Sequence, residues 1–231
     1  MLKFPRIFVL LIAVCILAAC SKSTNYAPVV NAWKQPANKQ GGYKVQADDT
    51  LYSIAWAYGI DYRELAKINN LHSPYALHKG QIIYTTSTAE QKQAAKKAPE
   101  IAAHPQKIVS NWVWPTKGTV ISQFSLQRPV NKGVNIAGNY GQAVYAANSG
   151  QIVYSGNGIN GYGNLIIIKH NDEYLSAYAH NKINLAKEGQ WVKKGQEIAL
   201  MGKGNSLKPE LHFEIRYKGK PINPLTKLPL R

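Results

Sequence analysis

The sequence predicts a multidomain protein in which a small α+β module, ordered strand, helix, helix, strand, precedes a larger all-β domain. Three observations predict this arrangement. Residues 42–86 place apolar side chains at helical spacing between two short alternating segments. Residues 87–111 change to Ala, Lys, Gln, Glu and Pro, which predicts a basic linker. Residues 112–231 contain short β-branched and aromatic segments separated by Gly, Asn and Asp, with no long helical pattern.

The first twenty residues form a targeting signal rather than part of a core. Lys3 and Arg6 give a basic start, residues 7–17 are an unbroken apolar run, and Leu-Ala-Ala-Cys follows at 17–20. The apolar run is shorter than a typical membrane-spanning helix. The tetrad resembles a bacterial lipobox, in which cleavage before Cys20 leaves a diacylated residue, and two acyl chains suffice for stable anchoring. The alternative is an ordinary signal peptide with an incidental Cys.

The cellular compartment and the net charge of the chain together limit which molecules it can bind. In bacterial lipoproteins, which this signal resembles, an Asp directly after the lipidated Cys favours retention in the inner membrane. Here Ser21 follows Cys20, so the resemblance implies that the protein is anchored in the outer membrane and faces the periplasm. The whole chain has 28 Lys and Arg residues and 12 Asp and Glu residues. Removal of the signal takes away Lys3 and Arg6, so the mature chain has a net charge of +14. Such an excess predicts an anionic partner. The signal excludes nucleic acid and leaves anionic wall peptides, lipopolysaccharide or an acidic protein, while a solubilising surface is the simpler alternative.

Residues 21–41 are polar and aperiodic, which predicts a flexible tether ahead of the small module. The module begins with a short alternating strand at 43–45, and Asp49 or Thr50 caps a first helix that Gly59 ends. A second helix begins near Asp61 and stops at 69–70, before a strand at 80–84. The inward positions expected of the two helices are Leu51, Ile54, Ala55, Tyr58, Leu65 and Ile68.

This module resembles the LysM family. The residues that carry the resemblance are Tyr43-x-Val45, Asp49-Thr50-Leu51, Ile54-Ala55, Leu65, Asn69-x-Leu71 and Gly80-Gln81. Asp48 departs from the family pattern, where Gly is usual, and indicates a changed turn. The resemblance implies binding of N-acetylglucosamine-containing glycans such as peptidoglycan, in a groove between two loops. The residues implied are Asp49, Thr50, Leu51, Asn69, Leu71 and Pro74; helix capping for the first two and core packing for Leu51 are the alternatives.

The second domain resembles the LytM (lysostaphin-like) family of peptidoglycan endopeptidases. The resemblance runs from Trp114-Pro115 through Tyr178-Ala179-His180 to Phe213-Glu214-Ile215-Arg216. It implies an antiparallel sheet sandwich or partly open barrel. Strand segments at 120–122, 151–154, 164–169, 174–180 and 211–217 agree with that fold, and Asn171-Asp172 suits a hairpin turn.

The metal ligands of that family are mostly absent. Active members carry His-x-x-x-Asp and His-x-His, whose three ligands correspond here to Asn131, Asn135 and His212. The two catalytic His positions correspond to His180 and Glu210. Catalytic zinc needs about three His, Asp, Glu or Cys ligands, and an Asn amide is a weak, neutral donor. We therefore predict no bound metal, no cofactor and no enzymatic activity of this domain's own.

Glu210 provides the one alternative for metal binding. It lies two residues before His212 on a predicted strand, so both side chains point to the same face and could hold a metal together with His180. The preferred interpretation is that Glu210 pairs with a neighbouring His and raises its pKa.

Three functions compete for the whole chain: a peptidoglycan endopeptidase with a variant metal site, a structural wall tether, and a non-catalytic activator. The combination of lipoprotein signal, LysM module, basic linker and degenerate LytM domain resembles NlpD and its relatives, which activate periplasmic N-acetylmuramoyl-L-alanine amidases. The resemblance implies that an empty groove binds a regulatory segment of the amidase and shifts it to its open state. The groove residues implied are Tyr178, His180, Glu210, His212, Phe213 and Arg216. The partners expected are therefore peptidoglycan, the amidase and, through lipid on Cys20, the membrane.

Overall fold

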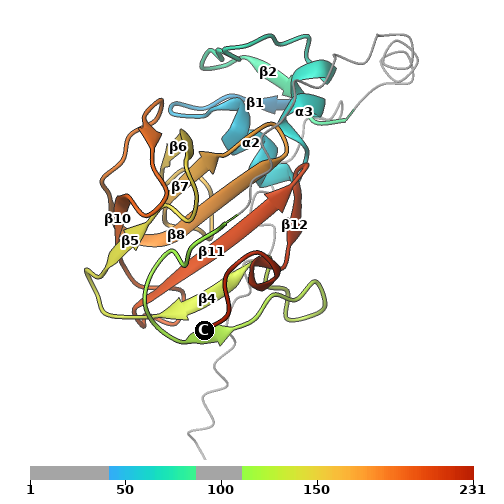
Figure 1. The fold of residues 1–231 in the computed structure, drawn as a ribbon. Coiled ribbons are helices and arrows are strands. Elements are labelled where there is room, and N and C mark those ends of the chain that lie inside the picture. The colour runs from blue at the N-terminus through green and yellow to red at the C-terminus, as the bar shows by residue number, and fades with distance from the viewer. Residues whose placement is uncertain (1–41, 87–110) are drawn as a thin grey trace, which may run out of the picture.

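A computed structural model describes residues 42–86 and 111–231 of the chain (Figure 1). The signal, the tether, Cys20 and nearly all of the linker lie outside the described residues. Within the described ranges, every helix is too short or too polar to cross a bilayer.

The small module has the order strand, helix, helix, strand that its sequence predicts. Strand β1 (Gly42–Lys44) pairs antiparallel with β2 (Ile82–Tyr84). Helix α2 (Leu51–Tyr58) begins at Thr50, whose Oγ1 accepts a hydrogen bond from the Ser53 amide at 3.1 Å. It ends at Gly59, where φ of 67° suits a residue without a Cβ. Helix α3 (Tyr62–Ile68) follows, capped by the Asp61 carboxylate.

The second domain is built on one large antiparallel sheet that does not close into a barrel, so the all-β prediction is confirmed. Its principal strand order is β3-β4-β11-β8-β7-β6-β9, with β10 pairing β5 and β8, and β12 pairing β11. The strands are β3 (Val120–Ser122), β4 (Val134–Ala137), β5 (Ala143–Tyr145), β6 (Gly150–Gly156), β7 (Asn164–Lys169), β8 (Tyr174–Asn184), β9 (Trp191–Val192), β10 (Glu197–Met201), β11 (Glu210–Tyr217) and β12 (Lys220–Ile222). A short 3-10 helix, η1 (Pro224–Thr226), follows them.

Strand β11 shows how the two faces of this sheet differ. Leu211, Phe213 and Ile215 point to one face and join an apolar core. The residues between them point to the other face because side chains alternate along a strand. Those residues are Glu210, His212, Glu214 and Arg216, all buried.

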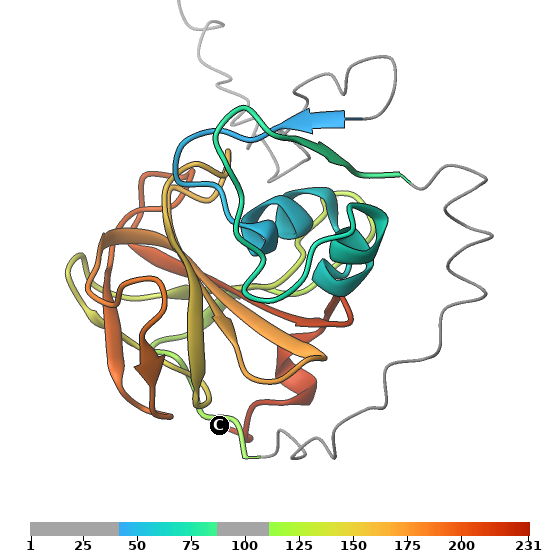
Figure 2. The same ribbon diagram turned by 90° about the horizontal axis from the view of Figure 1, so that it is seen from above.

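The small module packs directly onto that second face. Its core side chains form one hydrophobic cluster with apolar residues of β6, β7 and β8 from the large sheet. The Thr50 hydroxyl donates to the Val153 carbonyl at 3.2 Å, and the turn at Gly219 lies against the Ile60–Asp61 backbone. A Cβ on Gly219 would come within 2.5 Å of the Asp61 nitrogen. In Figures 1 and 2 the two helices accordingly lie beside the large sheet, so the domains form one packed body across the linker.

Candidate functional site

The three positions that correspond to zinc ligands meet where β4 pairs with β11. His212 stands opposite Asn135 in the register of the two strands, and Asn131 precedes β4. The His212 Nδ1 lies 2.9 Å from Asn135 Oδ1, and Asn131 Nδ2 lies 3.4 Å from the same oxygen. Asn131, Asn135 and His212 therefore lie side by side in the structure.

The amides at these positions do not fit a zinc ion. Asn131 Nδ2 donates to Ser122 Oγ at 2.9 Å, and its Oδ1 accepts from the Gly133 amide at 3.2 Å. Asn135 Nδ2 donates to Glu210 Oε1 at 2.9 Å while its Oδ1 accepts from His212. Zinc prefers His, Cys or carboxylate ligands, and here both amides are held by neighbours. Across residues 42–86 and 111–231, no group of three His, Cys, Asp or Glu side chains is arranged to hold a metal ion.

Glu210 lies beside His180 and Asn135. Its Oε1 is 3.4 Å from His180 Nδ1, in addition to the hydrogen bond from Asn135. His212 directs its Nε2 to Glu214 instead, at 3.1 Å. The His180–Glu210–His212 trio therefore does not converge on one point. His180 itself has a φ of 64°, a conformation that few non-glycine residues adopt.

Glu214 is the centre of a buried charged row along β11. Arg216 donates to its Oε2 at 3.0 and 3.1 Å, and the Tyr162 hydroxyl donates to its Oε1 at 2.7 Å. Burial alone would raise the pKa of Glu214, but Arg216, His212 and Tyr162 outweigh it and lower the pKa to about 2. The carboxylate is therefore ionised and can only accept hydrogen bonds.

Arg216 is bound to the small module rather than exposed. Its Nη1 donates to the Trp56 carbonyl at 2.6 Å, and its guanidinium carbon lies 3.5 Å from the centroid of the Trp56 ring. Only 1% of Arg216 is exposed. The cation is paired on one side with Glu214 and stacked on the other against an indole, which is a favourable buried environment for arginine. Helix α2 therefore covers this end of the row.

The predicted partner groove needs correction at three positions. Tyr178 and Phe213 point to the opposite face of the sheet, where their rings pack 5.3 Å apart in the apolar core. Tyr178 also accepts a hydrogen bond from the Ala147 amide at 2.8 Å. Neither ring can reach a partner without opening that core. Arg216 is covered by Trp56, which leaves Glu210, His180 and His212 as buried members of the pocket.

The predicted glycan residues have more varied placements. Two adjoining cavities, of about 390 and 470 Å³, run along the boundary between the domains, and both are lined by Asp49 and Thr50. Leu51 and Pro74 line the larger cavity, although Leu51 is also a core residue. Leu71 packs against that core. The Asn69 amide bonds Leu65 and Tyr84 within the module, so its role is structural.

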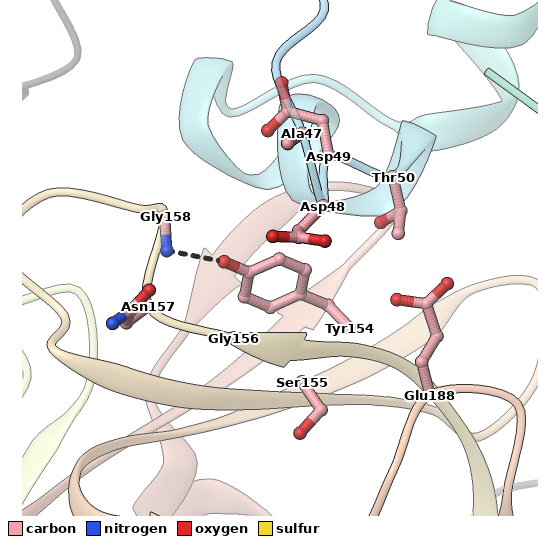
Figure 3. Close-up of a pocket in the computed structure, with 10 residues that line it drawn as sticks. All are labelled: Ala47, Asp48, Asp49, Thr50, Tyr154, Ser155, Gly156, Asn157, Gly158 and Glu188. Carbon is pink, nitrogen blue, oxygen red and sulfur yellow. Dashed lines mark hydrogen bonds between the residues drawn. The ribbon is translucent and has the colours of Figure 1, made fainter. Parts of the chain in front are cut away.

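Sequence reasoning missed the opposite wall of these cavities. The second domain contributes Gln151, the Tyr154–Gly158 segment and Glu188, and the small module adds Asp48, Tyr52 and Tyr75. Figure 3 shows Asp48, Tyr154 and Glu188 gathered around the smaller cavity, with Ser155 pointing away. No local pattern marks Gln151 or Glu188, because their position depends on how the domains pack.

Two protein families match parts of the chain. Residues 43–86 match the LysM domain, and residues 129–224 match peptidase family M23. The resemblances to the LysM and lysostaphin-like families are thereby confirmed.

Three curated proteins are similar over most of the chain. A lipoprotein NlpD/LppB homolog of Pseudomonas aeruginosa is 39% identical, covering 94% of this chain and 89% of its own length. The murein hydrolase activator NlpD of Escherichia coli is 38% identical, covering 82% and 68%. Outer membrane antigenic lipoprotein B of Haemophilus influenzae is 37% identical, covering 88% and 67%.

Proposed function

We propose, from the premise that this chain belongs to the NlpD/LppB family of lipoproteins, that it activates a periplasmic N-acetylmuramoyl-L-alanine amidase without being an enzyme itself. A peptidoglycan-related role follows from that membership and from the LysM domain. The activated enzyme cleaves the wall during daughter-cell separation, and the zinc chemistry belongs to that enzyme. The amidase class is the one that the sequence resemblance implies, and one relative's description as a murein hydrolase activator supports it.

The observation that carries the proposal is that Asn135, at a position of a zinc ligand in the family, is hydrogen-bonded to other side chains of the pocket. Asn135 donates to Glu210 and accepts from His212, so the same side chain joins the two halves of the pocket. A catalytic zinc site keeps an open position for water, whose activation requires the metal's charge. Here hydrogen bonds between side chains take the place of that arrangement. Such a domain can still bind a partner through its surface.

We place the amidase contact at the rim beside this pocket. Tyr140 is 54% exposed. Lys182 and Lys203 place their ammonium groups 4.8 and 5.8 Å from the centre of its ring. Lys182 follows His180 on β8, and Lys203 lies shortly before Glu210, so both border the pocket residues in sequence. An exposed aromatic ring flanked by two cations suits an acidic segment, and aromatic anchors dominate many protein interfaces.

The proposed location is the periplasmic face of the outer membrane, with lipid on Cys20, which lies outside the described residues. The printed names of relatives as lipoproteins, one of them an outer membrane lipoprotein, support it. Fractionation of cells that express the Cys20→Ser variant tests this placement. The variant should leave the membrane fraction, and retention there would contradict lipid anchoring.

The decisive experiment combines metal analysis with paired digestions. The purified mature chain should carry far less than one equivalent of zinc and release no wall fragments alone. It should accelerate release when a cognate amidase is added to purified peptidoglycan. One equivalent of zinc together with cleavage by the chain alone would establish a metalloendopeptidase. Absence of both activities with every periplasmic amidase of the source cell would leave a structural tether.

A surface variant sharpens this test. Tyr140→Ala with Lys182→Glu and Lys203→Glu should abolish most of the acceleration while the unfolding midpoint changes little. Trp191→Ala is the matched control, because Trp191 is 71% exposed and lies on β9 at the other end of the principal strand order. Full acceleration by the triple variant would overturn the proposed contact surface.

A further inference from the structure

We propose that both domains together form a binding groove for a chain of N-acetylated amino sugars, complete only while the small module is packed on the large sheet. The proposal rests on the peptidoglycan binding proposed above, and it assigns half of the glycan contacts to the M23 domain. Neither Gln151 nor Glu188 belongs to the LysM module, yet both face its glycan loops across the groove.

The groove follows the boundary between the domains. Its larger part, about 470 Å³, lies between the module's 49–52 and 73–77 segments on one side and the 151–153 segment with Glu188 on the other. Its smaller part, about 390 Å³, continues over Asp48 toward Tyr154. Ligand sites of this size commonly lie at domain boundaries. The two parts share Asp49, Thr50 and Glu188, so a chain-like ligand can pass from one to the other.

The lining chemistry suits a neutral saccharide. Tyr52 and Tyr75 are partly buried rings, 6.2 Å apart, that present apolar surface at the larger part of the groove. Aromatic faces contact the C–H surface of sugar rings and acetamido methyl groups, while nearby polar groups bond hydroxyls. Gln151 supplies such a polar group from β6.

Two carboxylates, one from each domain, border the smaller part of the groove. Asp48 holds a φ of 63°, an uncommon conformation for a residue other than glycine, and its side chain lies near Tyr154 in Figure 3. Glu188 reaches toward the same space. Burial and the Asp48 charge raise the pKa of Glu188. Within the described parts of the chain neither carboxylate forms a salt bridge, so both can accept hydrogen bonds from sugar hydroxyls.

Packing of the domains keeps the two walls at this spacing. Thr50, which lines both cavities, donates to the Val153 carbonyl. Trp56, within α2, stacks on Arg216 of β11. A ligand that contacts both walls binds the packed arrangement more tightly than the separated one. Glycan binding and domain packing therefore strengthen each other by the same factor.

The first test measures binding of chitotetraose, the tetramer of N-acetylglucosamine, to the full mature chain by calorimetry. Glu188→Ala and Gln151→Ala should each weaken binding about three- to tenfold, the effect of one lost hydrogen bond. Glu188→Gln should retain most of the affinity, because an amide oxygen still accepts. Glu197→Ala, an exposed carboxylate on β10, is the matched control and should bind as the parent does. Circular dichroism establishes that each variant is folded.

The second test moves the two domains apart without changing any residue that lines the groove. Gly219→Ala places a Cβ against the Ile60–Asp61 backbone and should weaken chitotetraose binding at least threefold. Gly195→Ala carries the same left-handed strain, with φ of 77° against 74°, but its Cβ would meet nothing within 4 Å. It should bind as the parent does.

The outcomes distinguish this proposal from the broader one. If the parent binds chitotetraose and the Glu188, Gln151 and Gly219 variants bind equally well, the shared groove is wrong and the module binds glycan alone. If Glu188→Gln loses as much affinity as Glu188→Ala, the groove recognises charge and the neutral-saccharide assignment is overturned. If the parent does not bind at all, the proposed glycan binding fails as well, whereas amidase activation is tested separately.

Discussion

The pocket around Asn135 and the groove around Glu188 use similar side chains but differ in where those side chains find their partners. In the pocket, amide, imidazole and carboxylate groups bond one another, and His212 is only 2% exposed. In the groove, Glu188 is exposed and feels the charge of the Asp48 carboxylate. Buried polar groups that satisfy one another stabilise a fold, whereas accessible groups without internal partners are available to a ligand. The Asn135 hydrogen bonds thus hold the pocket together, and the binding surfaces that we propose lie at the domain boundary and on the rim.

The largest expected effect comes from giving the pocket back its ligands. Asn131→His with Asn135→Asp recreates, with His212, a His, Asp, His set that suits zinc. Zinc content should rise from near zero to about one equivalent, measured by mass spectrometry of the purified chain. Adding His212→Ala should remove the metal again. If the double variant takes up no zinc, the internal hydrogen bonds rather than the ligand types close this pocket.

The next effect tests the charged row that joins the pocket to the module. Arg216→Ala should lower the free energy of unfolding by about 3–5 kcal/mol, because it leaves the Glu214 carboxylate buried without its main partner. Urea unfolding measures this. Lys218→Ala is the control, since Lys218, in the turn between β11 and β12, pairs with Glu173 at the surface and its loss should change the free energy of unfolding little. A loss below 1 kcal/mol for Arg216→Ala would mean that Glu214 regains water when the module moves.

The partly buried side chain of His170 predicts how stability depends on pH. Its ring nitrogens lie 2.8 Å from the Ser149 carbonyl and 2.7 Å from Ser176 Oγ. Burial lowers the pKa of His170 from 6.5 to about 4. Because the unfolded chain binds the proton first, this contribution is complete above pH 6.5 and is lost as the pH falls toward 4.

The expected loss from His170 is on the order of 2 kcal/mol between these pH values, allowing for partial exposure. Unfolding by urea at several pH values, for the parent and for His170→Asn, measures it as the difference between the two curves. Parallel curves would show that His170 does not carry this pH dependence.

The smallest expected effect tests whether the Asn69 amide in the small module stabilises the fold or binds glycan. Asn69 donates to the Leu65 and Tyr84 carbonyls and accepts from the Tyr84 amide. Asn69→Ala should therefore cost about 1–2 kcal/mol of stability. Chitotetraose affinity should stay within twofold of the parent at a temperature where the variant is folded. A large loss of affinity with little loss of stability would return Asn69 to the glycan site.

Patterns of neighbouring residues predicted the features that depend only on neighbouring residues. The Thr50 cap and the Gly59 stop follow from residue types and spacing. The meeting of Asn135 with His212, 77 positions apart, was expected only from the family resemblance. Alternation along β11 places Phe213, next to His212, on the face opposite the pocket. The same alternation would put Tyr178, two residues before His180, on the pocket face; it does not hold because His180 has a φ of 64°. Contacts such as Arg216 with Trp56, 160 positions apart, have no local signal. They depend on the packing of two whole domains, which spacing along the chain does not encode.

Gly219 has a consequence for how such proteins can be recombined. Gly219 has no side chain, so the hairpin between β11 and β12 can contact the Ile60–Asp61 backbone. The surfaces of the two domains are therefore complementary at this contact. A LysM module taken from an unrelated protein would have a different backbone at the position of residues 60–61, and the hairpin at Gly219 would not be complementary to it. Chimeras that exchange residues 42–86 alone should therefore need compensating changes at the hairpin. Inheritance of the two domains as a pair is the arrangement that this contact favours.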